Sequence, residues 1–229
     1  MFKRLQSVAL NAFAVALAIF VVSAGFVTAI GPNQNVNTFG ARDIGLATGS
    51  FSYIRTPDEN LNYWQGTEAA TGIGFYDFPP FTFIEAGGRK YKDLTGTFYY
   101  PYGSYMARTG YPSETHFASE IALAPYGMYN YYTIWTGPSR WSALWCGSTI
   151  CDWMLSNVNL DQIAGMRYAF AGAESDNQYI AFLGFTVYNQ MSNNFGGLTY
   201  YCHDTVKQNV AGYLSPCEGN FQWYAYYHP

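Results

Sequence analysis

Short runs of aromatic and β-branched residues, separated by turn-forming residues, constrain the fold of this chain most strongly. From residue 51 onward, Gly, Pro, Asn and Asp interrupt these runs, as in Pro79-Pro80, Gly87-Gly88 and Gly196-Gly197. This spacing is typical of antiparallel all-β sandwiches and barrels. The predicted strands are 74–78, 81–85, 96–100, 116–123, 130–135, 141–146, 167–172, 179–188, 198–202 and 221–227.

The composition supports one large hydrophobic core. Of the 229 residues, 20% are aromatic and only 11% are charged, which fits a single domain and excludes a disordered chain. The formal net charge of −4 argues against a nucleic-acid partner, because such partners require basic surfaces. Two segments depart from the strand pattern. Residues 30–50 are expected to be an irregular lead-in to a single β-sandwich domain at 51–229, and residues 152–164 a short helical turn or irregular crossover.

The N-terminus has the features of an export signal. Lys3 and Arg4 precede an apolar run over residues 8–30 that ends in small residues. This pattern predicts a signal peptide at 1–29, with an uncleaved membrane anchor as the alternative. Either interpretation places the remaining chain outside the cytoplasm, as a secreted or cell-surface protein.

Four cysteines, at positions 146, 151, 202 and 217, are expected to form two disulfides in an exported chain. Three pairings are possible. We favour Cys146–Cys151 and Cys202–Cys217, because each closes a loop that contains Gly or Pro. The cysteine spacing does not match a zinc site, so neither a metal nor another cofactor is expected.

Carboxylates are the best candidates for chemistry, because the sequence has no serine-hydrolase elbow, P-loop, zincin or dinucleotide motif. Glu174 ends an aromatic strand-like run, YAFAGAE. Side chains alternate along a strand, so Glu174 would share a face with Tyr168, Phe170 and Gly172. Aromatic surroundings would raise its pKa by desolvation. The alternative is a solvated glutamate at the start of a polar loop.

A second candidate pair lies in the segment HFASEIAL at 116–123. If this segment is one strand, His116 and Glu120 share a face, and Glu120 could raise the pKa of His116. A solvated outer face is the competing interpretation. Glu85 precedes Gly87-Gly88 and is interpreted as a turn residue rather than as part of a site.

Tryptophans offer a possible binding surface. Trp135, Trp141 and Trp145 lie in or near predicted strands, and exposed Trp rings stack well on sugars. Packing in the core is the alternative for most of these side chains. His116 is included with them as a candidate binding residue.

Four short motifs in order, GTFYYP (96–101), THFASEIAL (115–123), RWSALWCG (140–147) and MRYAFAGAESDN (166–177), resemble exported bacterial β-sandwich proteins. Those proteins are similar to the glutamic peptidases, including the neprosin type. The resemblance covers roughly residues 90–200. It implies a concanavalin-like sandwich of bent sheets with a groove, and it matches Glu174 to the groove glutamate.

In glutamic peptidases that glutamate works with a second Glu or a Gln, and the resemblance matches the partner's strand to residues 130–137. This stretch holds neither Glu nor Gln, so Glu120 is the candidate second carboxylate. The sequence therefore predicts an exported binding or structural module without complete catalytic machinery. One alternative is a secreted hydrolase of glutamic-peptidase type using Glu174 and Glu120. Another is a surface filament that assembles through residues 31–50. The expected partners are polypeptide, polysaccharide or further copies of the chain.

Overall fold

The computed structural model describes residues 36–45, 47–58, 60–75, 82–107, 113–160, 167–175, 185–188, 191–192, 200–203, 205–208, 212–217 and 223–227. The predicted signal segment at 1–29 lies outside these ranges. None of the described residues belongs to a helix that is long and apolar enough to cross a membrane. The described residues form strands and loops only.

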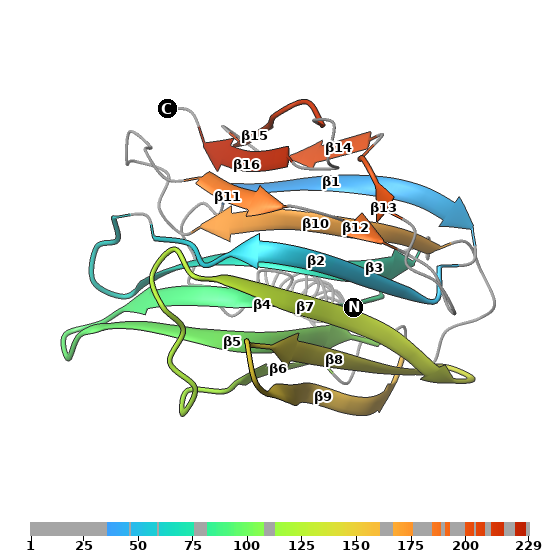
Figure 1. The fold of residues 1–229 in the computed structure, drawn as a ribbon, viewed down its shortest axis with the longest axis horizontal. Coiled ribbons are helices and arrows are strands. Elements are labelled where there is room, and N and C mark those ends of the chain that lie inside the picture. The colour runs from blue at the N-terminus through green and yellow to red at the C-terminus, as the bar shows by residue number, and fades with distance from the viewer. Residues whose placement is uncertain are drawn as a thin grey trace, which may run out of the picture. The chain divides into compact units, whose positions relative to one another are not determined.

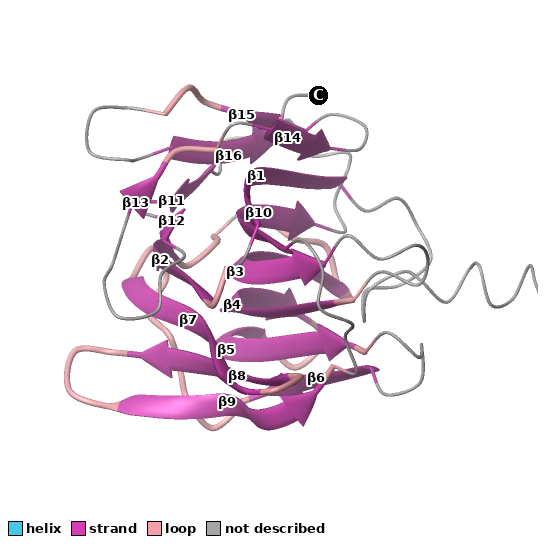
Figure 2. Cartoon of the chain, turned by 90° about the vertical axis from the view of Figure 1, so that its right-hand side faces the viewer, coloured by secondary structure: helices cyan, strands magenta, loops and turns pink. Residues whose placement is uncertain are grey.

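Two antiparallel sheets face each other, which confirms the predicted all-β sandwich (Figures 1 and 2). The first sheet has the order β14 (Thr205–Gln208), β1 (Val36–Gly45), β10 (Arg167–Ser175), β3 (Gln65–Phe75), β4 (Phe83–Lys92), β5 (Thr97–Met106) and β6 (Ser113–Phe117). The second sheet has the order β15 (Gly212–Leu214), β16 (Trp223–Tyr227), β11 (Phe185–Tyr188), β2 (Gly49–Arg55), β7 (Met128–Gly137), β8 (Arg140–Cys146) and β9 (Cys151–Asn159). Beside this path, β12 (Met191–Ser192) pairs with β2 and with β13 (Tyr200–Tyr201).

The hydrophobic core lies between the two sheets. In β3, Ala69 and Ile73 belong to the core, and side-chain alternation directs the intervening even-numbered residues to the outer face. The second sheet contributes Tyr131, Trp141 and Trp223, which are each 0% exposed. The outer face of the first sheet is therefore a separate surface, carried by a different set of side chains from the same strands.

Two segments are more regular than the sequence predicted. The expectation of an irregular lead-in is wrong for residues 36–45, which form β1 and pair with β10 and β14. The helical turn or crossover expected at 152–164 is wrong for residues 152–159, which lie in β9 (Cys151–Asn159). The register between β8 and β9 shifts, so Met154 and Leu155 are both buried although they are adjacent. Such a bulge breaks the period-2 pattern that identifies a strand.

The strand β3 begins nine residues earlier than the predicted strand at 74–78, at Gln65. Its sequence, QGTEAATGIGF, is rich in Gly, Ala and Thr and poor in aromatic residues. Gly and Ala are depleted in strands generally, so propensity does not reveal this element. It forms because β10 and β4 pair with it on both sides.

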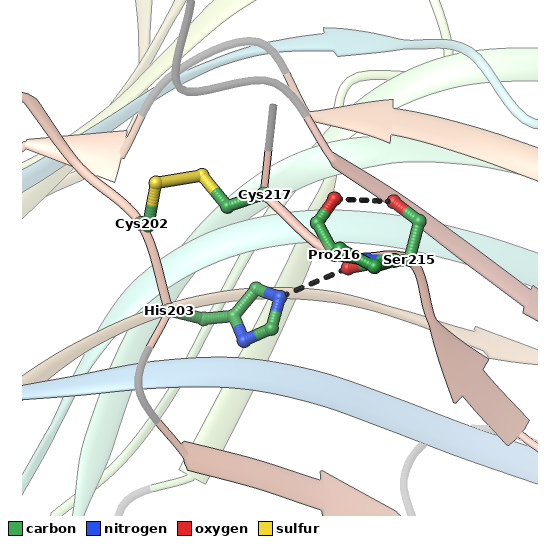
Figure 3. Close-up of a disulfide and its surroundings, with 5 residues drawn as sticks. All are labelled: Cys202, His203, Ser215, Pro216 and Cys217. Atoms are coloured by element: carbon green, nitrogen blue, oxygen red, sulfur yellow. Dashed lines mark hydrogen bonds between the residues drawn. A yellow bond between two sulfur atoms is a disulfide. The ribbon is translucent and has the colours of Figure 1, made fainter. Parts of the chain in front are cut away.

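Both favoured disulfides are present. Cys146–Cys151 closes the hairpin between β8 and β9, and Cys202–Cys217 joins the segments that follow β13 and β15. Beside the second disulfide, one ring nitrogen of His203, Nε2, lies 3.1 Å from the carbonyl oxygen of Ser215 (Figure 3). The disulfide and this contact connect two segments that are otherwise only short strands and loops. Two disulfides are compatible with an extracellular location.

Candidate functional site

Three neighbouring strands bring acidic and basic side chains together. The strands β10, β3 and β4 are neighbours in the first sheet (Figure 1). Their register places Glu174 of β10 directly opposite Glu68 of β3, and Glu68 directly opposite Arg89 of β4. Residues directly opposite on antiparallel strands have Cβ atoms about 4.5–5.5 Å apart. The two carboxyl groups are thus close neighbours, although 106 residues separate them in the chain.

This group lies on the outer face of the first sheet, opposite the core. Ala69 and Ala173, the neighbours of Glu68 and Glu174 in their strands, belong to the core cluster, so the two glutamates point the other way. The glutamates are nevertheless only 7% and 8% exposed. An outer sheet face normally exposes its charged side chains, so this degree of burial marks a specialised surface.

Glycines in β3 allow large side chains to lie across this face. A Cβ atom added to Gly72 would be 2.4 Å from Cζ of Phe170, and one added to Gly74 would be 2.1 Å from Cζ of Tyr168. A Cβ at Gly66 would likewise be 2.8 Å from a terminal nitrogen of Arg89. The two rings and the guanidinium therefore occupy space that ordinary side chains of β3 would fill.

A row of small residues makes room for Tyr102. Strand register aligns Gly172, Ala70, Gly87 and Tyr102 across β10, β3, β4 and β5. This row lies between the row of Glu68 and Arg89 and the row that contains Glu85. The backbone at Gly87 is also tightly packed, since an added Cβ would be 2.2 Å from the carbonyl oxygen of Ala69. The Tyr102 ring, which is 2% exposed, thus reaches the acidic group across a strip without large side chains.

The Tyr102 hydroxyl contacts two carboxyl groups. It donates a hydrogen bond to Oε1 of Glu85 over 3.5 Å, and it also hydrogen-bonds with Glu68. A phenol has a single proton to donate. The hydrogen bonds of Tyr102 oppose the rise in the pKa of both carboxyl groups.

Burial raises the pKa values of two carboxyl groups in this cluster, Glu68 and Glu85. Burial raises the pKa of Glu85 well above its usual value, and the nearby charges of Glu68 and Glu174 raise it further. Burial also raises the pKa of Glu68, although Arg89 and the Tyr102 hydroxyl act in the opposite direction. The Tyr102 pKa is raised well above its usual value, first by burial and then by the three carboxylates.

Arg89 compensates part of the negative charge. Its terminal nitrogen lies 2.8 Å from a carboxylate oxygen of Glu68, and both side chains are buried. The guanidinium carbon lies 4.8 Å from the centre of the Phe117 ring and 5.4 Å from that of Tyr91. These contacts hold the Arg89 cation beside Glu68. The ion pair indicates an ionised Glu68, whereas burial raises its pKa. We take the two together to mean that Glu68 is ionised near neutral pH and gains a proton at a higher pH than an ordinary glutamate.

Of the two carboxylates proposed from sequence, only Glu174 lies in this group. The strand β6 ends at Phe117, and Glu120 lies in the following turn, where it is exposed. The prediction that His116 and Glu120 share one strand face is therefore wrong. His116 is exposed on β6. The turn forms because the amide of Ile121 donates to the carbonyl of Ala118, which ends the extended conformation.

The predicted aromatic binding surface is wrong for two of its three tryptophans. Trp141 is 0% exposed and Trp145 is 4% exposed, and both pack in the core between the sheets. A buried ring has no face available for a ligand. Trp135 is partly buried and packs against the same core. Of the candidates for binding, only His116 is exposed.

Sequence reasoning missed Glu68 and misassigned Glu85. Glu85 was expected in a turn, but it lies within β4, opposite Gly72. The strand at 130–137, matched to the partner of Glu174, is β7 and belongs to the second sheet. It cannot place a side chain on this face. One signal for Glu68 was present in the sequence. Glu68 is the single acidic residue in a stretch of small residues, QGTEAATGIGF, and alternation along a strand would place it on the same face as Ala70 and Gly72.

No group of three or more His, Cys, Asp or Glu side chains among the described residues is arranged to hold a metal ion. The described side chains of this face present carboxyl, phenol and guanidinium groups. A pair of adjacent carboxyl groups can supply both a general base and a general acid.

Comparison with known proteins gives the fold. No family model and no curated protein matches the sequence. Two structures of scytalido-glutamic peptidase with transition-state analogues match with TM-scores of 0.56 and 0.57, each at 12% identity. A structure of SCP-B, a member of the eqolisin family of peptidases, in complex with the tripeptide Ala-Ile-His, matches with a TM-score of 0.52 at 11% identity. Each match covers 85% of this chain and 98% of the other.

The fold is similar to that of the glutamic peptidases. This agrees with the resemblance drawn from the four sequence motifs, and at this level of identity it concerns the fold alone.

Proposed function

We propose that the outer face of the first sheet is the active site of an exported peptidase that works at acidic pH. The observation that carries the proposal is the register of β10 and β3, which sets Glu174 directly opposite Glu68. The prediction of an incomplete site rested on the absence of a partner for Glu174 in residues 130–137. Glu68 and Glu85 remove that objection, because both lie on the same face as Glu174.

In the proposed reaction, ionised Glu174 takes a proton from a water molecule as the water oxygen bonds to the carbonyl carbon of the substrate. Protonated Glu68 then gives its proton to the amide nitrogen as the carbon–nitrogen bond breaks. Burial supports the acid role, because it raises the pKa of Glu68. Glu85 and Tyr102 act as positioning groups, since Tyr102 connects Glu85 to Glu68.

The fold similarity supports this choice of substrate, because two structures of scytalido-glutamic peptidase contain transition-state analogues and the structure of SCP-B contains a tripeptide. The deep burial of the acidic group supports catalysis over simple display of charge, since perturbed carboxyl groups cluster at functional sites. Export is part of the same proposal. It is supported by the predicted signal segment and by the two disulfides.

The test is proteolysis of an unfolded protein substrate and of fluorogenic peptides between pH 3 and pH 7. We expect activity in the acidic range and a loss of at least about 100-fold in Glu174→Gln, the usual contribution of general acid–base catalysis. Glu68→Gln should also lose activity. Glu85→Gln imitates the protonated carboxyl and should retain most activity at acidic pH. Glu114→Gln, on the exposed edge strand β6, is the matched control and should behave as wild type.

The three site variants separate the possible roles. If Glu68→Gln keeps its rate while Glu85→Gln loses it, Glu85 is the proton donor and the assignment above is wrong. If wild type binds peptides at this face without cleaving them, the chain is the binding module that the sequence first suggested. Equal activity in wild type and Glu174→Gln refutes the peptidase.

A further inference from the structure

We propose that the ion pair of Arg89 and Glu68 is a pH-operated lock on the acidic group. At neutral pH the pair holds Glu68 as a carboxylate, which has no proton to give, and acidification protonates Glu68 and opens the pair. This inference rests on the proposed peptidase function and adds the regulation of the same site. Arg89 acts through Glu68 and is therefore a positioning residue.

The two charged groups depend on each other because both are buried. A terminal nitrogen of Arg89 lies 2.8 Å from Oε1 of Glu68, and the two side chains are only 5% and 9% exposed. A surface ion pair has little effect because water screens its charges, whereas opening a buried pair leaves a charge without compensation. The proton on Glu68 is therefore coupled to Arg89 more strongly than it would be to a surface cation.

Other contacts hold Arg89 in place whether or not Glu68 is charged. The guanidinium carbon lies 4.8 Å from the centre of the Phe117 ring and 5.4 Å from that of Tyr91. Gly66 leaves room for the guanidinium, because an added Cβ would be 2.8 Å from a terminal nitrogen and 3.1 Å from Nε. None of these contacts involves Glu68. The cation thus stays beside a protonated Glu68, and the pair can form again when the pH rises.

Arg89 is the single cation that the four strands around the site direct to this face. The structure describes β3, β4, β5 and β10 completely, and β3 and β5 contain neither Lys nor Arg. In β4 the two lysines alternate with Arg89 and therefore point to the opposite face. In β10, Arg167 lies over the core ring of Trp141, 5.4 Å from its centre. Without Arg89, no cation from these strands would compensate the charge of Glu68.

The remaining titratable groups on this face do not replace Arg89. They are Glu85, Tyr91, Tyr100, Tyr102 and Glu174. Tyrosines stay neutral in the acidic and neutral range, and a neighbouring carboxylate favours a neutral Glu68 because like charges repel. Burial raises the pKa of Glu68, Arg89 lowers it, and the hydrogen bond from Tyr102 lowers it by a smaller amount. The pH at which Glu68 takes up a proton therefore depends on Arg89.

The lock matches the proton transfers of the proposed reaction. Glu174 must be ionised to take a proton from water, while Glu68 must be protonated to give one. Arg89 favours the ionised form of Glu68, so it prevents this working combination at neutral pH. Acidification protonates Glu68 and allows cleavage to begin. Arg89 should accordingly set the upper pH limit of activity.

The experiment compares profiles of kcat/KM for one fluorogenic peptide between pH 3 and pH 8. In Arg89→Met the decline toward neutral pH should move to higher pH by at least about one unit, because an adjacent arginine lowers a carboxyl pKa by about 1–3 units. The ratio of activity at pH 7 to activity at pH 4 should then rise at least about tenfold. Arg89→Lys keeps the charge, so its decline should lie nearer to that of wild type than the decline of Arg89→Met does.

Lys90→Met is the matched control. Lys90 is the next residue in β4, is 7% exposed and pairs with Asp58 over 2.6 Å, but it points away from the acidic group. Its replacement should leave the decline at the pH of wild type, whatever its effect on stability. The proposal is overturned if the decline in Arg89→Met stays where it is in wild type, or if Lys90→Met moves it equally far.

Glu85 is the other carboxyl whose titration could produce such a decline, because burial raises its pKa as well. The double variant Glu85→Gln/Arg89→Met separates the two groups. Its decline should be displaced from that of Glu85→Gln as far as the decline of Arg89→Met is displaced from wild type. If the displacement disappears, Arg89 acts through Glu85 and the proposal is wrong.

A measurement on wild type keeps the test valid if Arg89→Met does not fold. Carbon-13 NMR follows the carboxyl carbon of Glu68, assigned by its loss in Glu68→Gln, and nitrogen-15 NMR follows Nε of Arg89. Both resonances should shift in one pH step, at the pH where kcat/KM declines. An Arg89 resonance that does not change while Glu68 titrates refutes the lock.

The same data separate the lock from the proposed function. If wild type cleaves no peptide at any pH, the peptidase proposal fails, and the NMR titration still tests the coupling. A joint step that moves to higher pH in Arg89→Met then supports the lock alone. If wild type cleaves peptides but the resonances of Glu68 and Arg89 change independently, the lock fails and the peptidase stands.

Discussion

Replacement of Tyr102 with Phe tests the electrostatic account of the acidic group without depending on any enzymatic activity. The substitution removes one hydroxyl and keeps the ring in place. The hydroxyl contacts Glu85 and Glu68, and it favours the ionised form of both carboxyl groups. A hydrogen bond to a charged group stabilises a protein by about 1.5–3 kcal/mol. At 3.5 Å the bond to Glu85 is at the long limit, so we expect a loss of about 1–2 kcal/mol at neutral pH.

The loss should depend on pH with a definite sign. Without the hydroxyl, the pKa values of Glu68 and Glu85 rise further in the folded state. A carboxyl whose folded pKa is raised loses stability as pH rises above its unfolded pKa. The difference between wild type and Tyr102→Phe should therefore be small near pH 4 and should increase toward pH 7. Urea unfolding at several pH values, with an unchanged m-value, measures it.

Tyr105→Phe is the control for this measurement. Tyr105 lies in the same strand, is 8% exposed and belongs to the core cluster on the opposite face. Its replacement should change stability by an amount that is nearly independent of pH between 4 and 7. If Tyr102→Phe shows the same loss at every pH, or only the loss seen in Tyr105→Phe, its hydroxyl is not coupled to the carboxyl groups and the account is refuted.

Three further predictions concern stability. Burial raises the pKa of Glu85, so ionisation of this carboxyl should lower the free energy of unfolding as pH rises from 4.5 to 7. Glu85→Gln should reduce this decline, because a glutamine cannot ionise. Parallel pH profiles for variant and wild type would contradict this. Tyr131→Phe should leave stability unchanged or raise it by about 1 kcal/mol in thermal unfolding, because the buried Tyr131 hydroxyl has no hydrogen-bond partner among the described residues. A clear loss of stability would show that the hydroxyl makes a hydrogen bond. Gly103→Ala should cost about 1–3 kcal/mol in urea unfolding, because the new Cβ would be 2.7 Å from Cβ of Met154 in the facing sheet; no change would mean that the sheets separate easily.

Several features of this protein were predictable because they depend on local sequence. Aromatic runs bounded by turn residues predict strands, and the strands at 130–135 and 141–146 lie within β7 and β8. The pairs 146–151 and 202–217 were favoured because each closes a loop that contains Gly or Pro, and both are present. Glu174 was placed correctly at the end of an aromatic strand, since alternation along one strand needs no information about its neighbours.

The composition of the acidic group could not be predicted in this way. Glu68 lies in a Gly- and Ala-rich strand with little propensity of its own, and β1 mixes polar residues with glycines. Both elements form because neighbouring strands pair with them. Tertiary structure also decided which tryptophans are buried. The sequence alone determined an all-β chain with two disulfides and one well-placed carboxylate. Only the pairing of β10, β3, β4 and β5 decided which residues share a face with it, because register joins positions that are distant in the chain.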